Sequence, residues 1–295
     1  SSLARGGGMW WHHDNRTKEK TMPAMIANRI TIEVEQHGDK GNPVMLLIRG
    51  LGSQLIHWPD ALIDGFVQRG FHVVTFDNRD TGLSQKFAGV AYSTDDMALD
   101  AVGVLDALEI ARAHVFGISM GGMITQRLLV DHADRVLNAT IVMSSSGADD
   151  LPPAKPKVWE LMRQEPASHD RATVVANSLK SDYAWFSPSY PFDAAARAAL
   201  IGAAYDRCYE PAGVERQYAA MVAGRGRESD LASINTPVLV IHGTADTLLP
   251  IEHGRDIATR ITDAQLIEIE GMGHDLEGAV PSMIVEHVVG FIAGA

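Results

Sequence analysis

The stretch VFGISMGG, residues 115–122, sets a serine between glycines. Ser119 follows an apolar run typical of a buried strand and precedes an apolar pattern typical of a helix, so the spacing G-x-S-x-G predicts a sharp strand-to-helix turn. Gly117 and Gly121 carry no Cβ and would let the neighbouring chain pass close to a serine in a strained conformation. Such a turn exposes the hydroxyl at a helix N-terminus, which favours a nearby oxyanion.

A serine hydroxyl is a poor nucleophile at neutral pH and needs a base, together with a group that orients the base. Asp246 stands in the loop after the apolar run 237–243, and His274 stands in the loop after the run 264–270. Parallel strands present their C-terminal ends at one edge of a sheet. We therefore expect Ser119, Asp246 and His274 to converge as nucleophile, orienting acid and base.

Other residues compete for two of these roles. His242, at the end of the run 237–243, is an alternative base, although a structural, hydrogen-bonded role suits it better. Asp149 and Asp150 follow the run 139–143 and are alternative acids. The expected absence of a bound metal rests on the lack of a His or carboxylate cluster at metal-ligand spacing, and no cofactor is expected either.

The elements that must position these residues alternate along the chain. Helical stripes separate several short apolar runs, for example at 97–108 and from Pro281 onward. This alternation predicts a mainly parallel sheet with helices on both faces. The expected strands are 30–35, 44–48, 72–76, 113–118, 139–143, 237–243 and 264–270.

Residues 147–230 interrupt this rhythm. They contain no clear buried strand and are rich in proline, tyrosine and tryptophan, which predicts a helical lid inserted into a core of residues 23–146 and 231–295. Trp185, Phe186 and Tyr190 are candidates for the lining of an apolar substrate pocket, although aromatic side chains also hold short helices together. Residues 1–22 are interpreted as an extension outside the fold.

Bulk composition excludes several classes of protein. The net charge of −12 opposes binding to nucleic acid or to an anionic membrane, and no apolar run is long enough to cross a bilayer. Cys208 is the only cysteine, which rules out an intrachain disulfide and fits a cytoplasmic protein. The oligomeric state, including a homo-oligomer, stays open.

The motifs GISMGG, IHGTADTLLP and GMGHDL, with RGLGS and FDNRDTGLS, resemble the α/β-hydrolase fold family over about residues 25–293. The resemblance implies a mainly parallel, eight-stranded type of sheet and points to esterases and methyl-esterases of small molecules. It also implies that the backbone amides of Leu51 and Met120 form the oxyanion hole. One departure is Arg49, because the family commonly has His-Gly where this chain has Arg49-Gly50.

These observations favour a serine esterase that acts on a small ester or lactone by acyl transfer. A lactonase, such as one acting on acyl-homoserine lactones, is one alternative. A C–C bond hydrolase and a cofactor-free peroxidase of the same fold are others. From a different class, the fold can serve as a ligand receptor with an inactive triad, although the presence of all three residue types argues against this.

Overall fold

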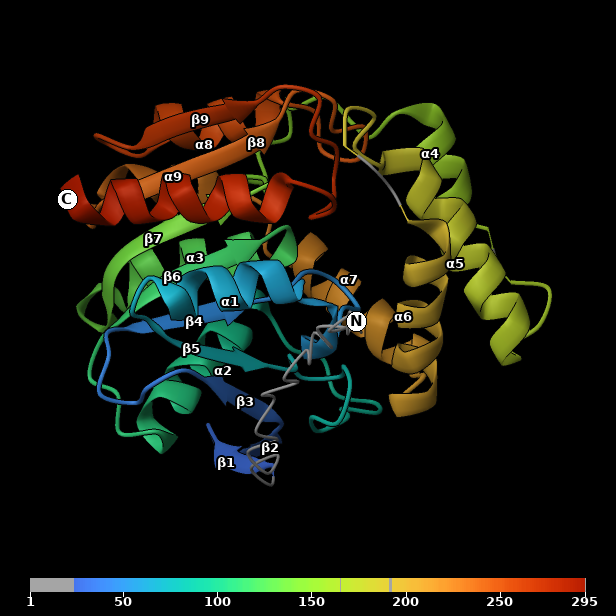
Figure 1. The fold of residues 1–295 in the computed structure, drawn as a ribbon, viewed down its shortest axis with the longest axis horizontal. Coiled ribbons are helices and arrows are strands. Elements are labelled where there is room, and N and C mark those ends of the chain that lie inside the picture. The colour runs from blue at the N-terminus through green and yellow to red at the C-terminus, as the bar shows by residue number, and fades with distance from the viewer. Residues whose placement is uncertain (1–23, 165, 191–192, 295) are drawn as a thin grey trace, which may run out of the picture.

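The core of the chain is a seven-stranded sheet in the order β3-β5-β4-β6-β7-β8-β9. The computed structural model describes residues 24–164, 166–190 and 193–294; the expected extension at 1–22 lies outside them. All neighbouring strands are parallel except the edge pair β3 and β5 (Figure 1). The strands are β3 (Val34–His37), β4 (Val44–Ile48), β5 (His72–Phe76), β6 (Ala113–Ile118), β7 (Val136–Val142), β8 (Val238–Gly243) and β9 (Gln265–Ile269).

The bounds predicted for the strand over 30–35 are wrong, because the strand is interrupted at Glu33. The Glu33 N–H donates to Ser84 Oγ (3.0 Å) and its carbonyl accepts from the Asp77 N–H (3.0 Å). The first half becomes β2 (Ile30–Ile32), which pairs with β1 (Met25–Ala27) in a separate two-stranded sheet. In the described part of the chain the main sheet therefore has seven strands rather than eight, while its predicted, mainly parallel character is confirmed.

Helices cover both faces of the sheet, as the alternating pattern predicts. One face packs against α1 (Asp60–Gln68) and α9 (Val280–Gly294), and the other against α2 (Thr94–Ala107), α3 (Met120–Asp131) and α8 (Glu252–Arg260). Short 3-10 turns occupy Leu55–His57, Ala133–Arg135, Arg227–Ser229 and Leu231–Ser233. Among the described residues, no helix is long and apolar enough to cross a membrane.

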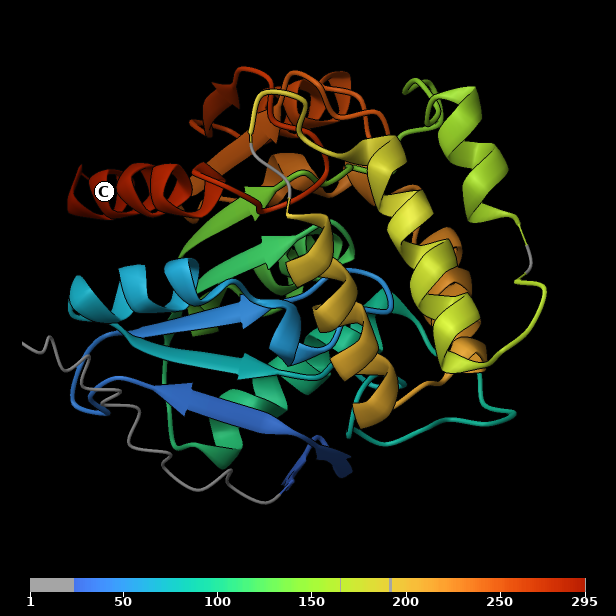
Figure 2. The same cartoon turned by 45° about the vertical axis from the view of Figure 1, so that its right-hand side comes forward.

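The span 147–230, which we call the helical insertion, connects β7 to β8. Its described residues form α4 (Pro156–Met162), α5 (Arg171–Trp185), α6 (Ala194–Arg207) and α7 (Pro211–Ala223), and no strand. Pro156 and Pro211 begin two of these helices, a position where the missing N–H costs nothing. The arrowheads of the parallel strands point toward the side where α4, α5 and α6 lie (Figures 1 and 2). The insertion thus stands at the C-terminal edge of the sheet, and its role as a lid stays a prediction.

The connection from β6 to α3 leaves no room for side chains at its two glycines. A Cβ at Gly117 would overlap the Thr125 hydroxyl and the Gly121 carbonyl. A Cβ at Gly121 would overlap the Ile48 carbonyl at the end of β4. Three backbone segments therefore meet in direct contact around residue 119, which is the physical basis of the G-x-S-x-G spacing.

Replacing Gly121 by alanine is expected to destabilise the protein by about 3 kcal/mol or more, because the backbone carbonyl it would meet cannot rotate away. Gly290→Ala is the matched control: this glycine lies on the exposed face of α9 with open space around it, and the change should stabilise by roughly 0.5–1 kcal/mol. Urea unfolding measures both changes. A Gly121→Ala protein as stable as the wild type would contradict the close packing.

Candidate active site

Ser119 occupies a strained turn between β6 and α3. Its φ of 52° and ψ of −120° lie in a region that costs a residue with a side chain about 1–3 kcal/mol. Its N–H donates to the Val142 carbonyl (3.0 Å), and its own carbonyl accepts from Ser144 Oγ (2.8 Å). These bonds hold the backbone while the half-buried side chain makes no capping bond to α3. The predicted turn is confirmed, with the serine hydroxyl at a helix N-terminus.

His274 and Asp246 lie side by side at the C-terminal edge of the sheet. Asp246 is in the loop after β8 and His274 in the loop after β9, and His274 Nδ1 lies 2.7 Å from Asp246 Oδ2. Nδ1 carries the hydrogen in this contact, because a carboxylate can only accept. The other ring nitrogen, Nε2, is thereby left in the form that can take a proton from a hydroxyl.

Asp246 is held in its ionised form. Burial alone would raise the pKa of this carboxyl, but attraction to His274, the hydrogen bond from His274 and the nearby His242 ring outweigh burial, and the pKa lies well below its usual range. Its second oxygen, Oδ1, accepts from the N–H groups of Leu248 (2.9 Å) and Leu249 (2.8 Å). The carboxylate is therefore fixed in both charge and direction.

The competing candidates have other surroundings. His242 is fully buried; its Nε2 donates to the Leu249 carbonyl (2.7 Å) and lies 3.5 Å from Asp246 Oδ2. A histidine without solvent exposure, bonded to a backbone carbonyl, supports the acid loop rather than reaching a substrate. Asp149 and Asp150 are exposed at the start of the helical insertion, whereas the carboxylate that meets His274 belongs to Asp246.

The loop after β4 lies against Ser119. A Cβ on Gly50 would stand 3.1 Å from Ser119 Cβ and 3.6 Å from its Oγ. In the part of the chain that the structure describes, the Leu51 N–H donates to no other group. Met120 is the first residue of α3, where a helix leaves its N–H groups without an intrahelical acceptor. The two amides expected in an oxyanion hole are thus on the elements that flank the serine.

Residues of the helical insertion contact the His274 loop through backbone and side-chain groups. The Trp185 carbonyl accepts from the His274 N–H (2.7 Å), and a Cβ on Gly273 would collide with Phe186. The Tyr190 hydroxyl donates to the Glu270 carbonyl (3.0 Å). The three candidate pocket residues therefore border the base loop. A role of their side chains in binding substrate stays a prediction.

Sequence reasoning missed the residues that hold these loops in place. Ser187 belongs to none of the sequence motifs. Its Oγ nevertheless donates to Asp275 Oδ2 (2.7 Å) and accepts from the Gly273 N–H (2.8 Å). Gln217 accepts from the Gly52 N–H (2.9 Å) across 165 positions of sequence. Both contacts join the helical insertion to a loop of the core, and no local spacing or periodicity could have indicated them.

A mainly parallel sheet, in which a buried strand runs through a strained serine into a helix, defines the class of α/β hydrolases. The comparisons agree with this class. A family model described as alpha/beta hydrolase fold matches residues 43–276, so the chain belongs to the α/β-hydrolase fold family. The predicted fold class is confirmed.

Individual relatives narrow the resemblance. The chain is 31% identical over 280 residues to the rhodomycin D methylesterase DnrP of Streptomyces peucetius, covering 87% of this chain and 93% of that protein. Among solved structures it resembles the enol-lactonase of Burkholderia xenovorans LB400 (TM-score 0.74, 22% identity, 92% and 100% covered). It also resembles Est816, an N-acyl homoserine lactone degrading enzyme (TM-score 0.74, 25% identity, 91% and 100% covered). The predicted resemblance to methyl-esterases is confirmed.

Arg49, the departure from the family pattern, is a buried cation. Its guanidinium lies 4.6 Å from the centre of the Trp58 ring, and its Nε has no hydrogen-bond acceptor among the described residues. Burial, with repulsion from Arg197, lowers the pKa of Arg49 to about 9, and attraction to Glu277 offsets this only in part. At neutral pH the folded protein therefore holds a charge that its surroundings disfavour.

Replacing Arg49 by methionine is expected to stabilise the fold by about 1–3 kcal/mol at pH 7, because an apolar side chain of similar length fills the site without a desolvated charge. The cost of the charge is present below the folded-state pKa of about 9 and falls as the pH rises from there toward 12.5. The gain should therefore shrink above about pH 9. Urea unfolding of both proteins at pH 7 and pH 10 measures it, and a methionine variant less stable than the wild type at pH 7 would refute the cost.

Proposed function

We propose that this α/β hydrolase cleaves carboxylic esters of small, largely apolar molecules through an acyl-enzyme. The observation that carries the proposal is the 2.7 Å contact of His274 Nδ1 with Asp246 Oδ2, at the sheet edge that also presents Ser119 on its strained turn. The relationship to a methylesterase, 31% identical over most of both chains, supports an ester as the substrate. It makes methyl esters the first compounds to test.

In the first half of the reaction, Ser119 Oγ attacks the ester carbonyl while His274 Nε2 takes the hydroxyl proton. Asp246 keeps the imidazole in the required tautomer and stabilises its protonated form. The tetrahedral intermediate then collapses: the bond between the carbonyl carbon and the alcohol oxygen breaks, and His274 returns the proton to the departing alcohol. An ester now joins the acyl group to Ser119.

In the second half, water replaces the alcohol. His274 removes a proton from the water as its oxygen attacks the acyl carbon, and the proton passes to Ser119 Oγ when the acyl–serine bond breaks. The products are a carboxylic acid and an alcohol, and the enzyme returns to its starting state. No oxidant, reductant or metal takes part in this sequence.

The N–H groups of Leu51 and Met120 supply the third part of the mechanism. Both are on elements that flank Ser119, and the N-terminus of α3 carries partial positive charge. We assign them to the negative oxygen that develops on the carbonyl during each attack. Loss of one such donor typically costs about 2.7–4 kcal/mol of transition-state stabilisation, so the loop after β4 matters almost as much as the base.

A lactone is the second candidate substrate. A lactone is an internal ester and needs the same attack, and Est816, described as degrading N-acyl homoserine lactones, is 25% identical with a TM-score of 0.74. In that case the alcohol stays attached to the acyl group when the ring opens. A cytoplasmic location and a homo-oligomeric state stay predictions beside this assignment.

The nucleophile is tested by replacing Ser119 with alanine. Hydrolysis of a short-chain nitrophenyl ester and of a methyl ester should fall roughly 10⁴-fold or more, since the attacking oxygen is gone. Ser229→Ala, at an exposed position far along the chain, is the control and should retain full activity. A fluorophosphonate should phosphonylate Ser119, with loss of fluoride, in the wild type and in Ser229→Ala but not in Ser119→Ala. Full activity in Ser119→Ala would refute the assignment, and inactivity of the wild type on all esters would favour the receptor or a C–C substrate.

The identity of the base is tested by comparing two histidines beside the same carboxylate. His274→Gln should lose roughly 10³-fold or more in kcat, because no group remains to take the serine proton. His242→Gln should lose less than about tenfold in kcat. The hydrogen bond of His242 Nε2 goes to the Leu249 carbonyl (2.7 Å), whereas Asp246 Oδ2 lies farther away, at 3.5 Å. Steady-state kinetics on one ester measures both. A larger loss in the His242 variant would reverse the two roles.

A further inference from the structure

Gln217, in the helical insertion, is hydrogen-bonded to the loop that carries the Leu51 amide. It lies on α7 and is fully buried, and its Oε1 accepts from the Gly52 N–H (2.9 Å). Gly52 has a φ of 65°, and the Ser53 N–H closes the turn onto the Gly50 carbonyl (3.2 Å). The bond from Gln217 therefore fixes the peptide plane between Leu51 and Gly52, directly after the proposed oxyanion donor.

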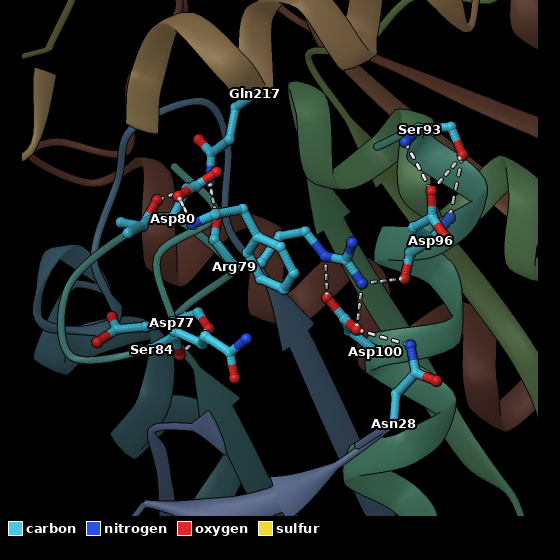
Figure 3. A network of polar contacts seen from close by, with 12 residues as sticks. Asn28, Asp77, Arg79, Asp80, Ser84, Ser93, Asp96, Asp100 and Gln217 are labelled. Atoms are coloured by element: carbon cyan, nitrogen blue, oxygen red, sulfur yellow. Dashed lines mark hydrogen bonds and ion pairs between the residues drawn. The ribbon is translucent and has the colours of Figure 1, made fainter. Parts of the chain in front are cut away.

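The other end of the Gln217 amide is anchored in the core. Its Nε2 donates to the Arg79 carbonyl (2.7 Å) and to Thr81 Oγ1 (2.6 Å), so the orientation of the amide is set by the two acceptors at Nε2 and the one donor at Oε1. Figure 3 shows the Gln217 side chain reaching from its helix down to the loop with Arg79 and Asp80. A buried amide with all its partners satisfied is rigid.

The segment on which Gln217 rests is itself immobilised. The Arg79 guanidinium makes two bonds to Asp100 on α2 (2.6 and 2.7 Å; Figure 3). It also lies over the rings of Phe87 and Tyr92. The Asp80 carboxylate accepts two bonds from Arg216 of α7 (2.9 and 2.7 Å). Gln217 therefore connects the turn at Gly52 to a part of the core that is held from several sides.

A second glutamine, in the loop after β4 itself, connects this loop to the helical insertion. Gln54, at the end of the same loop, donates to the carbonyls of Ala204 (2.7 Å) and Cys208 (2.9 Å) at the end of α6. Arg207 donates to Gln54 Oε1 (2.8 Å) and to Asp77 Oδ2 (2.6 Å). The loop after β4 is thus bonded to both α6 and α7.

We infer that Gln217 is a positioning residue that holds the Gly50–Ser53 turn in the form that presents the Leu51 N–H to the reacting carbonyl. This inference rests on the proposed function for its effect on rate, but the contact itself does not. Removing the acceptor lets the Leu51–Gly52 peptide rotate, which moves a donor that must meet the oxyanion within a few tenths of an ångström. A displacement of about 1 Å can cost as much as 10²-fold in rate.

The experiment compares Gln217→Met with Arg216→Met on the same helix. Both variants loosen α7, but only Gln217 touches the Gly52 amide. In Gln217→Met we expect kcat for a methyl or nitrophenyl ester to fall about 10- to 100-fold, with KM changed less than about threefold, because the interaction acts on the transition state. In Arg216→Met, kcat should stay within about threefold, because the Arg79 carbonyl that anchors Gln217 is still held by the two bonds from Arg79 to Asp100. Circular dichroism melting curves of both variants set an assay temperature below their unfolding transitions.

Hydrogen exchange supplies a readout that does not depend on hydrolysis. The peptide covering residues 50–55 should exchange faster in Gln217→Met than in the wild type or Arg216→Met, since the Gly52 N–H has lost its acceptor. Equal exchange in all three proteins, or an equal loss of kcat in both variants, would overturn the inference. If exchange separates the variants while the wild type cleaves no ester, the proposed function fails, and Gln217 keeps only its hold on the turn.

Discussion

The site depends on the direct backbone contact between the end of β4 and the start of α3. Gly121 sits where any side chain would overlap the Ile48 carbonyl, and Gly117 sits where one would overlap the Gly121 carbonyl. This contact sets the loop after β4 so close to Ser119 that a Cβ on Gly50 would stand 3.1 Å from Ser119 Cβ, and the serine itself has a φ of 52°. The conformational strain of about 1–3 kcal/mol at the serine is offset by the packing of the surrounding sheet and helix. Without the two glycines the end of β4 and the turn that carries Ser119 would have to move apart.

Much of this arrangement could be predicted from the sequence, because the relevant signals are local. The strands β4, β5 and β6 are continuous apolar runs, and their observed bounds agree with the expected ones. The loops of Asp246 and His274 follow such runs, so the parallel sheet alone brings the two side chains to one edge. Binary patterning and glycine spacing carry this information within about ten residues of each position.

The missed features are those in which distant segments compensate for a local rule. Periodicity predicts one strand over 30–35, but Glu33 finds better partners in Ser84 and Asp77, and the strand divides. The partner of Gln217 is 165 positions away, and Arg49 looks like any loop arginine until its burial against Trp58 is known. A single sequence holds no record of which polar groups meet after folding. These contacts are therefore defined only in the folded structure.

The helical insertion contacts the loops of the candidate site through two separate sets of residues, rather than lying over them as one continuous cover. The end of α5 and the segment after it hold the base loop, through the Trp185 carbonyl on the His274 N–H and through Ser187 on Asp275. The helices α6 and α7 hold the loop after β4 through Gln54 and Gln217. The loop that carries Asp246 also meets the insertion, because Thr247 Oγ1 donates to the Ala184 carbonyl (2.7 Å) and the Lys155 N–H donates to the Thr247 carbonyl (2.9 Å). Movement of α6 and α7 as a unit would therefore disturb the loop after β4, whereas movement of α5 would disturb the loops that carry Asp246 and His274.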